Sequence, residues 1–209
     1  EFEQPQLDIW SWHDDYLQPV QLLKRSRELK KTYTAYINLD NGKFVQLGDL
    51  DVPNVVVSNK QMADLVLIGN DKQYRIESQW NANRLTDIYV VNVNDGSRKL
   101  VMEKVCFGAT STSPDGQWVI MYDKNSRHWF QYTIATGEFK NLTESLGVAF
   151  HDEDHDTPNL PSPAGQAIWF EDNSAFVIGD RYDYWMFDPK GGAEPKMFTE
   201  SYGRNNNTR

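Results

Sequence analysis

The sequence predicts an all-β fold: a partial β-propeller of about three and a half to four blades, each of four antiparallel strands, with one short N-terminal helix. Residues 106–143 read as four short β-type runs separated by turn residues. A phrase of strand, glycine turn and strand then recurs four times along the chain. One four-stranded meander cannot bury its own faces in water, so it needs neighbours of the same kind.

Residues 1–31 read differently from the rest and are predicted to connect blades or sheets. Residues 7–12 alternate like a short strand, and Asp14 or Asp15 is a candidate cap for a helix whose first turn contains Pro19. The cations of this helix crowd toward its C-terminal end, where they complement the helix dipole. We interpret them as a solvated face, with a phosphate-binding patch as the alternative: Lys24, Arg25, Arg27, Lys30 and Lys31.

Residues 32–200 are predicted to form the blades, followed by a polar tail at 201–209. The repeated turn glycines lie 54, 41 and 54 positions apart, which is blade spacing with about a dozen extra residues in two copies. The extra residues fall at 71–84 and 147–163. Insertions in repeat proteins map to loops that often share one binding face. The four turn glycines are Gly42, Gly96, Gly137 and Gly191.

A second kind of turn is predicted inside the blades. Ser113, Pro114, Asp115 and Gly116 precede the alternating run 117–122, and proline followed by Asp-Gly favours a tight reversal. The counterpart in the last blade is the segment 171–174, and 58–61 is a weaker one. These turns indicate architecture and identify no site.

Composition excludes several classes of function. The 209 residues carry a formal net charge of −9, which argues against nucleic acid or an anionic membrane as the main partner. The apolar runs 55–57 and 65–68 are far shorter than the roughly 18 residues of a membrane span. Cys106 is the one cysteine, so no internal disulfide forms, and its apolar setting indicates a buried thiol.

The sequence holds none of the common catalytic motifs. It has no Gly-x-Ser-x-Gly elbow, no phosphate-binding loop and no Cys-x-x-Cys pair. We therefore predict that this segment is itself non-catalytic.

The densest polar cluster is the acidic run in the second insertion. Three carboxylates at alternate positions share the spacing that opens a calcium loop, and we take them as candidate calcium ligands: Asp152, Asp154 and Asp156. The later part of that loop pattern fails, because Pro163 stands where a bidentate glutamate is needed. His151 and His155 could bind a transition metal instead. A solvated acidic loop is the alternative to any metal site.

Aromatic residues gather near the last predicted hairpin. Tyr182 and Trp185 are expected to pack between blades, with a stacking platform facing a channel as the alternative. Arg181 is expected to form an internal ion pair rather than a substrate clamp. Together with His151 and His155, these three residues are our candidate channel or substrate contacts.

Several phrases in this order resemble a known family. They are LDIWSWHDDYLQPVQ at 7–21, the turn at 113–116, and the stretch 150–189, which includes DEDHD and DRYDYW. The chain resembles, over nearly its whole length, the propeller region of bacterial serine peptidases of the prolyl oligopeptidase and dipeptidyl aminopeptidase family.

The resemblance implies a propeller that precedes an α/β-hydrolase domain with a Ser-Asp-His triad and that gates the access of short peptides to it. The expected partners are therefore peptide substrates and the hydrolase domain of the same parent chain. The hydrolase domain is not in this sequence, so no catalytic residue carries over, and the paired glutamates that bind a substrate amino terminus have no clear match. The family also implies a periplasmic or extracellular location in bacteria. The alternative is a stand-alone propeller that binds a protein or glycan without catalysis.

Overall fold

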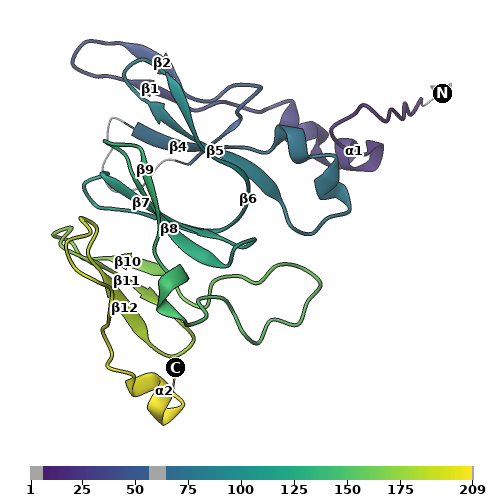
Figure 1. Ribbon diagram of the computed structural model, residues 1–209. Helices are drawn as coiled ribbons and strands as arrows, with labels where there is room; N and C mark the ends of the chain where they lie inside the picture. Colours follow the sequence, from purple (N-terminus) through teal and green to yellow (C-terminus); the bar gives the residue numbers. More distant parts are fainter. Residues whose placement is uncertain (1–6, 57–64, 209) are drawn as a thin grey trace.

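The computed structural model describes residues 7–56 and 65–208 (Figure 1). Thirteen strands, all paired antiparallel, make up most of this part of the chain. Successive meanders lie beside one another as a fan, which fits the predicted partial β-propeller. The inner turn predicted at 58–61 lies outside the described residues.

The strands follow the repeat closely. A two-stranded sheet comes first, and the last four strands form a separate four-stranded meander. Between them a seven-stranded ladder runs in sequence order. The bounds are β1 (Ala35–Ile37) and β2 (Phe44–Gln46); β3 (Asn54–Val56), β4 (Leu65–Asn70), β5 (Leu85–Asn92), β6 (Arg98–Thr112), β7 (Trp118–Asp123), β8 (His128–Thr133) and β9 (Glu138–Asn141); and β10 (Ala167–Trp169), β11 (Phe176–Gly179), β12 (Tyr184–Phe187) and β13 (Lys196–Met197).

Strand β6 belongs to two meanders at once. Residues from Arg98 to Cys106 pair with β5, and residues from Phe107 to Thr112 pair with β7. The sequence predicted a separate meander that begins at residue 106, whereas β6 continues through that point without a loop. The strand bends there, and Lys104 adopts a left-handed backbone with φ 54°.

The bend in β6 is held by a buried carboxylate. Asp87, on β5, is 3% exposed and accepts a hydrogen bond of 2.9 Å from the backbone N–H of Lys104. It also accepts bonds from the Tyr74 hydroxyl, at 2.7 Å, and from the Gln73 amide. Burial, reinforced by the bond to Asp87, raises the pKa of Tyr74 to about 12. One side chain thus joins the first insertion to both strands.

The turn glycines confirm the repeat. Each has a positive φ, between 69° and 74°, which glycine adopts without the steric cost of a Cβ atom. Gly116 and Asn173 do the same in the inner turns, with φ values of 72° and 59°. The four turn glycines are Gly42, Gly96, Gly137 and Gly191.

Three apolar clusters fill the spaces between neighbouring sheets. The core is therefore divided among the interfaces between neighbouring meanders rather than gathered in one centre. The first cluster joins β2 to β4 and β5 and includes Val45, Ile68 and Val91; the second joins the β5 and β7–β8 regions and includes Val90, Val119 and Tyr132; the third joins β7–β8 to β11–β12 and includes Tyr122, Trp129, Phe176 and Ile178.

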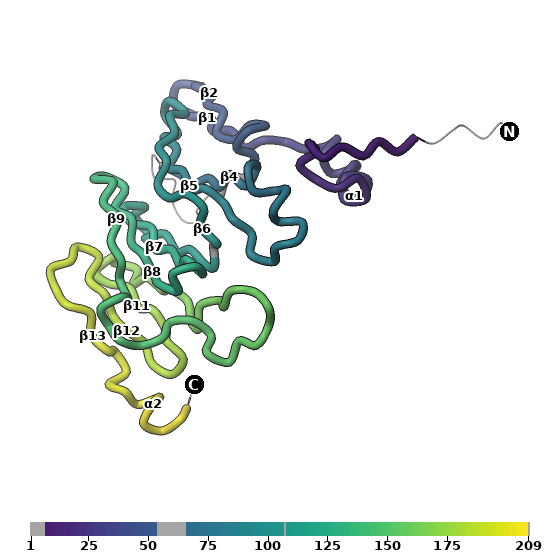
Figure 2. Tube along the Cα trace, turned by 45° about the vertical axis from the view of Figure 1, so that its right-hand side comes forward, coloured from purple at the N-terminus to yellow at the C-terminus, as the bar shows by residue number. Residues whose placement is uncertain are grey.

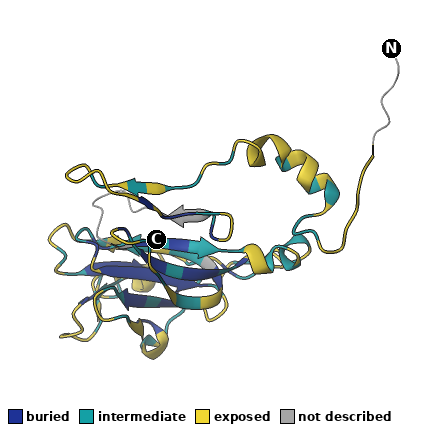
Figure 3. Ribbon diagram, turned by 90° about the horizontal axis from the view of Figure 1, so that it is seen from above, coloured by how far each residue is buried: buried dark blue, intermediate teal, exposed yellow. Residues whose placement is uncertain are grey.

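The N-terminal arm, which we define as residues 7–31, stands apart from the sheets (Figure 3). Its helix α1 (Gln18–Glu28) buries no residue. Pro19 lies in the first turn as predicted, but the N-cap is Leu17 and no side chain caps the helix. Residues 7–12 form no strand, because no other strand pairs with them. Within the described residues, neither helix combines the length and apolar character that a membrane crossing requires.

The tail contains a short helix that the sequence did not predict, α2 (Tyr202–Asn206). Asp183, which is 1% exposed, accepts hydrogen bonds from the backbone N–H groups of Gly203 and Arg204, at 3.0 and 3.1 Å, and from the Thr199 hydroxyl at 2.6 Å. Burial by itself would raise the pKa of Asp183, but these hydrogen bonds lower it below the ordinary value of 3.8. Contacts with Asp183, just before β12, and not a local signal, order this helix.

We expect Asp183→Asn to lower the free energy of unfolding by about 2 kcal/mol at neutral pH, because an amide cannot replace a charged acceptor of three hydrogen bonds. Since the folded-state pKa lies below the unfolded one, the contribution of this carboxylate is present above about pH 4 and is lost as the pH falls through the folded-state value. Urea unfolding at several pH values measures the difference, with Glu194→Gln as an exposed control. A difference that grows as the pH falls from 4 contradicts the assignment.

Candidate functional site

Both insertions lie on one side of the fan, on which the N-terminal arm also lies (Figures 1 and 2). They touch each other, because the backbone N–H of Leu160 donates a 2.7 Å hydrogen bond to the Asn83 side-chain oxygen. The repeated glycine turns occupy the opposite side in Figure 1. We call the side that carries residues 71–84 and 147–163 the insertion face, and it is the candidate functional site.

The second insertion is a closed loop. His151 and Pro163 form an isolated antiparallel bridge at its base, and the backbone N–H of Asp152 donates to the Ser162 carbonyl at 2.9 Å. The 3-10 turn η3 (Glu144–Leu146) leads into it. A hollow of about 280 Å³ opens beside this base. Its lining residues are Asp152, Glu153, Ser162, Pro163, Ala164 and Arg181.

Arg181 is the one candidate contact that reaches this hollow. Its guanidinium lies 2.8 Å from an Asp154 carboxylate oxygen, and its carbon Cζ lies 5.3 Å from the centre of the Tyr182 ring. The buried Nε atom has no hydrogen-bond partner within the described residues. The sequence suggested an ion pair with a neighbour such as Asp180, whereas Arg181 pairs across to the insertion.

The two histidines of the insertion differ in environment. Burial, together with repulsion from Arg127, lowers the pKa of half-buried His151, which favours the neutral imidazole. The Nε2 atom of His155 lies 2.8 Å from the Asn159 carbonyl oxygen and 3.1 Å from the Thr157 hydroxyl. The His155 ring is therefore held by residues of its own loop.

The acidic run does not assemble into a ligand set. In the described part of the chain, no three His, Cys, Asp or Glu side chains gather as a metal site. The Asp152 carboxylate accepts the Asp154 N–H at 3.1 Å, and the Asp154 carboxylate faces Arg181. Asp152, Asp154 and Asp156 thus have the spacing that opens a calcium loop. In the structure, however, Asp152 forms a local turn and Asp154 forms an ion pair.

Trp185 and Tyr182 have packing roles. The Trp185 indole N–H donates to Asp180 at 3.0 Å, and its ring meets Phe150 edge to face at 6.2 Å. The Tyr182 ring lies between the guanidinium groups of Arg181 and Arg204, at 5.3 and 5.2 Å. Both aromatic residues thus make contacts close to β12.

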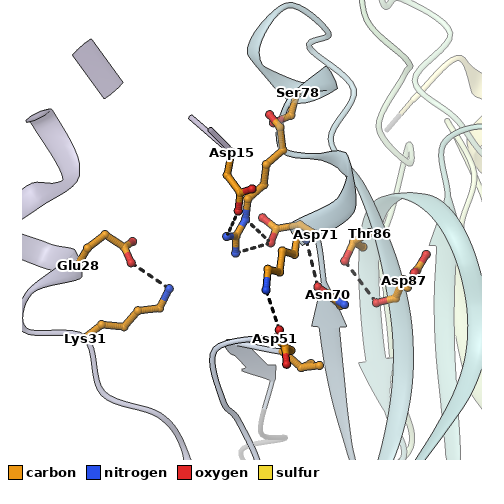
Figure 4. Close-up of polar contacts among 12 residues, drawn as sticks. Asp15, Glu28, Lys31, Asp51, Asn70, Asp71, Ser78, Thr86 and Asp87 are labelled. Carbon is orange, nitrogen blue, oxygen red and sulfur yellow. Dashed lines mark hydrogen bonds and ion pairs between the residues drawn. The ribbon is translucent and has the colours of Figure 1, made fainter. Parts of the chain in front are cut away.

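The first insertion contains an ion-pair centre that sequence analysis missed. Arg75, between the 3-10 turns η1 (Lys72–Tyr74) and η2 (Glu77–Gln79), contacts Asp15 of the arm at 3.1 Å and Asp71 at 3.1 Å. Figure 4 shows Asp15 and Asp71 converging on this point. The side chain of Gln79 also bonds the arm, through the Leu17 N–H and the Asp15 carbonyl. Partners 60 residues apart in sequence give no local signal.

The one cysteine of the chain is not exposed as a nucleophile. Cys106 is 3% exposed, and burial raises the pKa of its thiol, which keeps it protonated and unreactive. Within the described residues, the insertion face offers ion pairs and a hollow.

Comparisons with known proteins concern the fold. No protein-family model and no curated protein matches the sequence. Similar solved structures include TolB from Acinetobacter baumannii, at 16% identity over 78% of this chain and 36% of that one, with a TM-score of 0.44. The β-propeller domain of the Trilobed protease from Pyrococcus furiosus matches at 16% over 68% and 42%, with a TM-score of 0.41. Acylaminoacyl peptidase from Pyrococcus horikoshii matches at 16% over 66% and 24%, with 0.40.

This chain therefore spans 36% and 42% of the length of the first two structures. At these identities and scores the similarity does not bear on activity. The assignment to a partial propeller depends on the antiparallel meanders themselves.

We expect millimolar Ca²⁺ to leave the Tm of the chain unchanged relative to Mg²⁺ at the same ionic strength, because the three carboxylates are not gathered around one point. Differential scanning fluorimetry measures this. A rise in Tm that is specific to Ca²⁺ and is abolished by Asp156→Asn would instead establish a calcium site in the second insertion.

Proposed function

We propose that this chain is the noncatalytic propeller portion of a secreted serine peptidase of the prolyl oligopeptidase type. It gates the access of peptides to a separate α/β-hydrolase domain of the same parent chain, in the periplasm or outside a bacterial cell. The observation that carries the proposal is the insertion face: a fan of repeated meanders gathers its two insertions, in contact with each other, on one side.

The contacts of this face suit a gate. The second insertion is anchored at its base, and among the described residues its tip is tied to the rest of the chain by the bond of Leu160 to Asn83 and the ion pair of Asp154 with Arg181. Ion pairs that are partly open to water contribute about 1 kcal/mol or less, so such a tip can move at small cost. A loop of this kind can admit short peptides and exclude folded chains by size.

The N-terminal arm supports an adjoining surface. Eight of its large apolar side chains are exposed, and exposed apolar surface of this extent marks a contact with another surface. In the proposed parent, the hydrolase domain covers part of this apolar surface. The eight are Leu7, Ile9, Trp10, Trp12, Leu17, Leu22, Leu23 and Leu29.

We expect the isolated 209-residue chain to hydrolyse no chromogenic peptide, because neither its sequence nor the insertion face supplies a nucleophile with an adjacent base. The coding sequence after residue 209 is expected to encode Gly-x-Ser-x-Gly followed by Asp and His, and alanine at that serine should abolish turnover by the parent. Turnover by the chain alone contradicts the proposal. Absence of the downstream motif would favour the alternative, a stand-alone propeller that binds a protein or glycan.

The gating role is tested separately, in the active parent. Replacing residues 153–161 by Gly-Gly keeps the bridge at the base of the loop and removes its tip, so we expect kcat/KM for long peptides to rise several-fold relative to that for dipeptide substrates. Replacing the exposed turn 40–42 on the opposite side by Gly-Gly is the control. If the ratio of long to short substrates stays unchanged, the second insertion is not the gate.

A further inference from the structure

Helix α1 has two faces with different chemistry. Lys24 and Arg27 lie three positions apart on the helix, so they project on one side, and Lys31 follows shortly after the helix ends. That side faces the first insertion across a cleft of about 790 Å³. Leu22 and Arg25 lie on the other side of the helix and line a second hollow toward residues 7–9, to which Lys24 also contributes.

The cleft is lined mainly by cations from two separate parts of the chain. Four come from the helix and the residues that follow it, and two come from the first insertion. Only two carboxylates, Glu28 and Asp71, line the same cleft. This excess of positive charge is unusual in a chain with a net charge of −9. The cations are Lys24, Arg27, Lys30, Lys31, Arg75 and Arg84.

Two of the six cations are neutralised within the protein. Lys31 pairs with Glu28 at 3.2 Å, and Arg75 pairs with Asp15 and Asp71, both at 3.1 Å. Figure 4 shows the Glu28–Lys31 pair apart from Asp15 and Asp71, which lie near each other. The other four form no ion pair within the described residues: Lys24, Arg27, Lys30 and Arg84.

An aromatic ring positions one of the unpaired cations. The Lys24 Nζ atom lies 3.6 Å from the centre of the Tyr16 ring, and the Arg75 guanidinium carbon lies 5.4 Å from the same centre. Two cations that share one ring are held near each other, although they repel. Tyr16 therefore directs Lys24 to the cleft rather than leaving it free in solvent.

The helix dipole explains only part of this charge. Arg25 and Arg27 both lie in the last turn of α1, where cations are favourable. The dipole has no bearing on Arg84, which belongs to the insertion on the far wall. Convergence of unpaired cations from both walls calls for a different explanation, which is a counter-anion.

We propose that the cleft between α1 and the first insertion binds a small multivalent oxyanion, whose phosphate or carboxylate groups pair with Lys24, Arg27, Lys30 and Arg84. Guanidinium groups bind such oxyanions in a bidentate manner, and ammonium groups bind them as point charges. The cleft volume lies within the range of about 300 to 1,000 Å³ that small-molecule sites occupy. This site is independent of the proposed gating role.

Isothermal titration of the 209-residue chain with inorganic tripolyphosphate and with citrate tests the proposal. We expect one saturable site per chain for at least one of them, with an affinity that falls as salt rises toward about 0.15 M. Preference for tripolyphosphate identifies a phosphate ligand, and preference for citrate identifies a carboxylate ligand. If neither anion binds at low salt, the proposal is overturned.

Matched variants locate the site. Arg27→Gln and Arg84→Gln should each raise the Kd about tenfold or more, because each removes a charged hydrogen-bond donor from one wall. Arg25→Gln removes the same charge from the same helix turn on the opposite side and should change the Kd by less than about twofold, allowing for screening by salt. All three arginines are exposed, and circular dichroism checks that each variant folds. An equal loss in Arg25→Gln means diffuse attraction to the arm and overturns the site.

Discussion

The carboxylate of Asp87 lies where three parts of the structure meet. It sits on β5, receives the Lys104 N–H at the bend of β6, and receives Tyr74 from the first insertion. A buried charge is very costly unless hydrogen bonds replace its water, so its donors must stay in place. The left-handed backbone of Lys104, which is costly for a residue with a Cβ atom, persists because this contact holds it.

The bend of β6 in turn decides how the sheets are arranged. One strand ends the second meander and begins the third, so the two cannot separate without breaking a continuous ladder. The apolar clusters on either side of β5 and β7 then fill the spaces to the neighbouring sheets. The fan is therefore held by interfaces between sheets, as in other repeat architectures, where each unit contacts only its neighbours.

The same arrangement places both insertions and the N-terminal arm on one side of the fan. Asp87 fixes the first insertion, Asn83 ties it to the second, and Arg75 attaches the N-terminal arm to it. The first insertion therefore contacts both the second insertion and the N-terminal arm, although its sequence contains no conspicuous motif. The second insertion has the more conspicuous sequence, an acidic run. In the structure, Asp152 forms a local turn and Asp154 pairs with Arg181.

The sequence alone determined the all-β class, the repeat and most strands, because these depend on local signals. Glycines such as Gly42 and Gly137 are needed where φ is positive, and continuous apolar runs place β7 and β11 in the core, where every position is buried. Only the tertiary structure decided the course of β6, the formation of α2, and which carboxylates pair with Arg75 and with Arg181. Those outcomes depend on partners far apart in the chain, such as Asp87 with Lys104 and Asp183 with Gly203, and no local pattern encodes which partner a charge will meet.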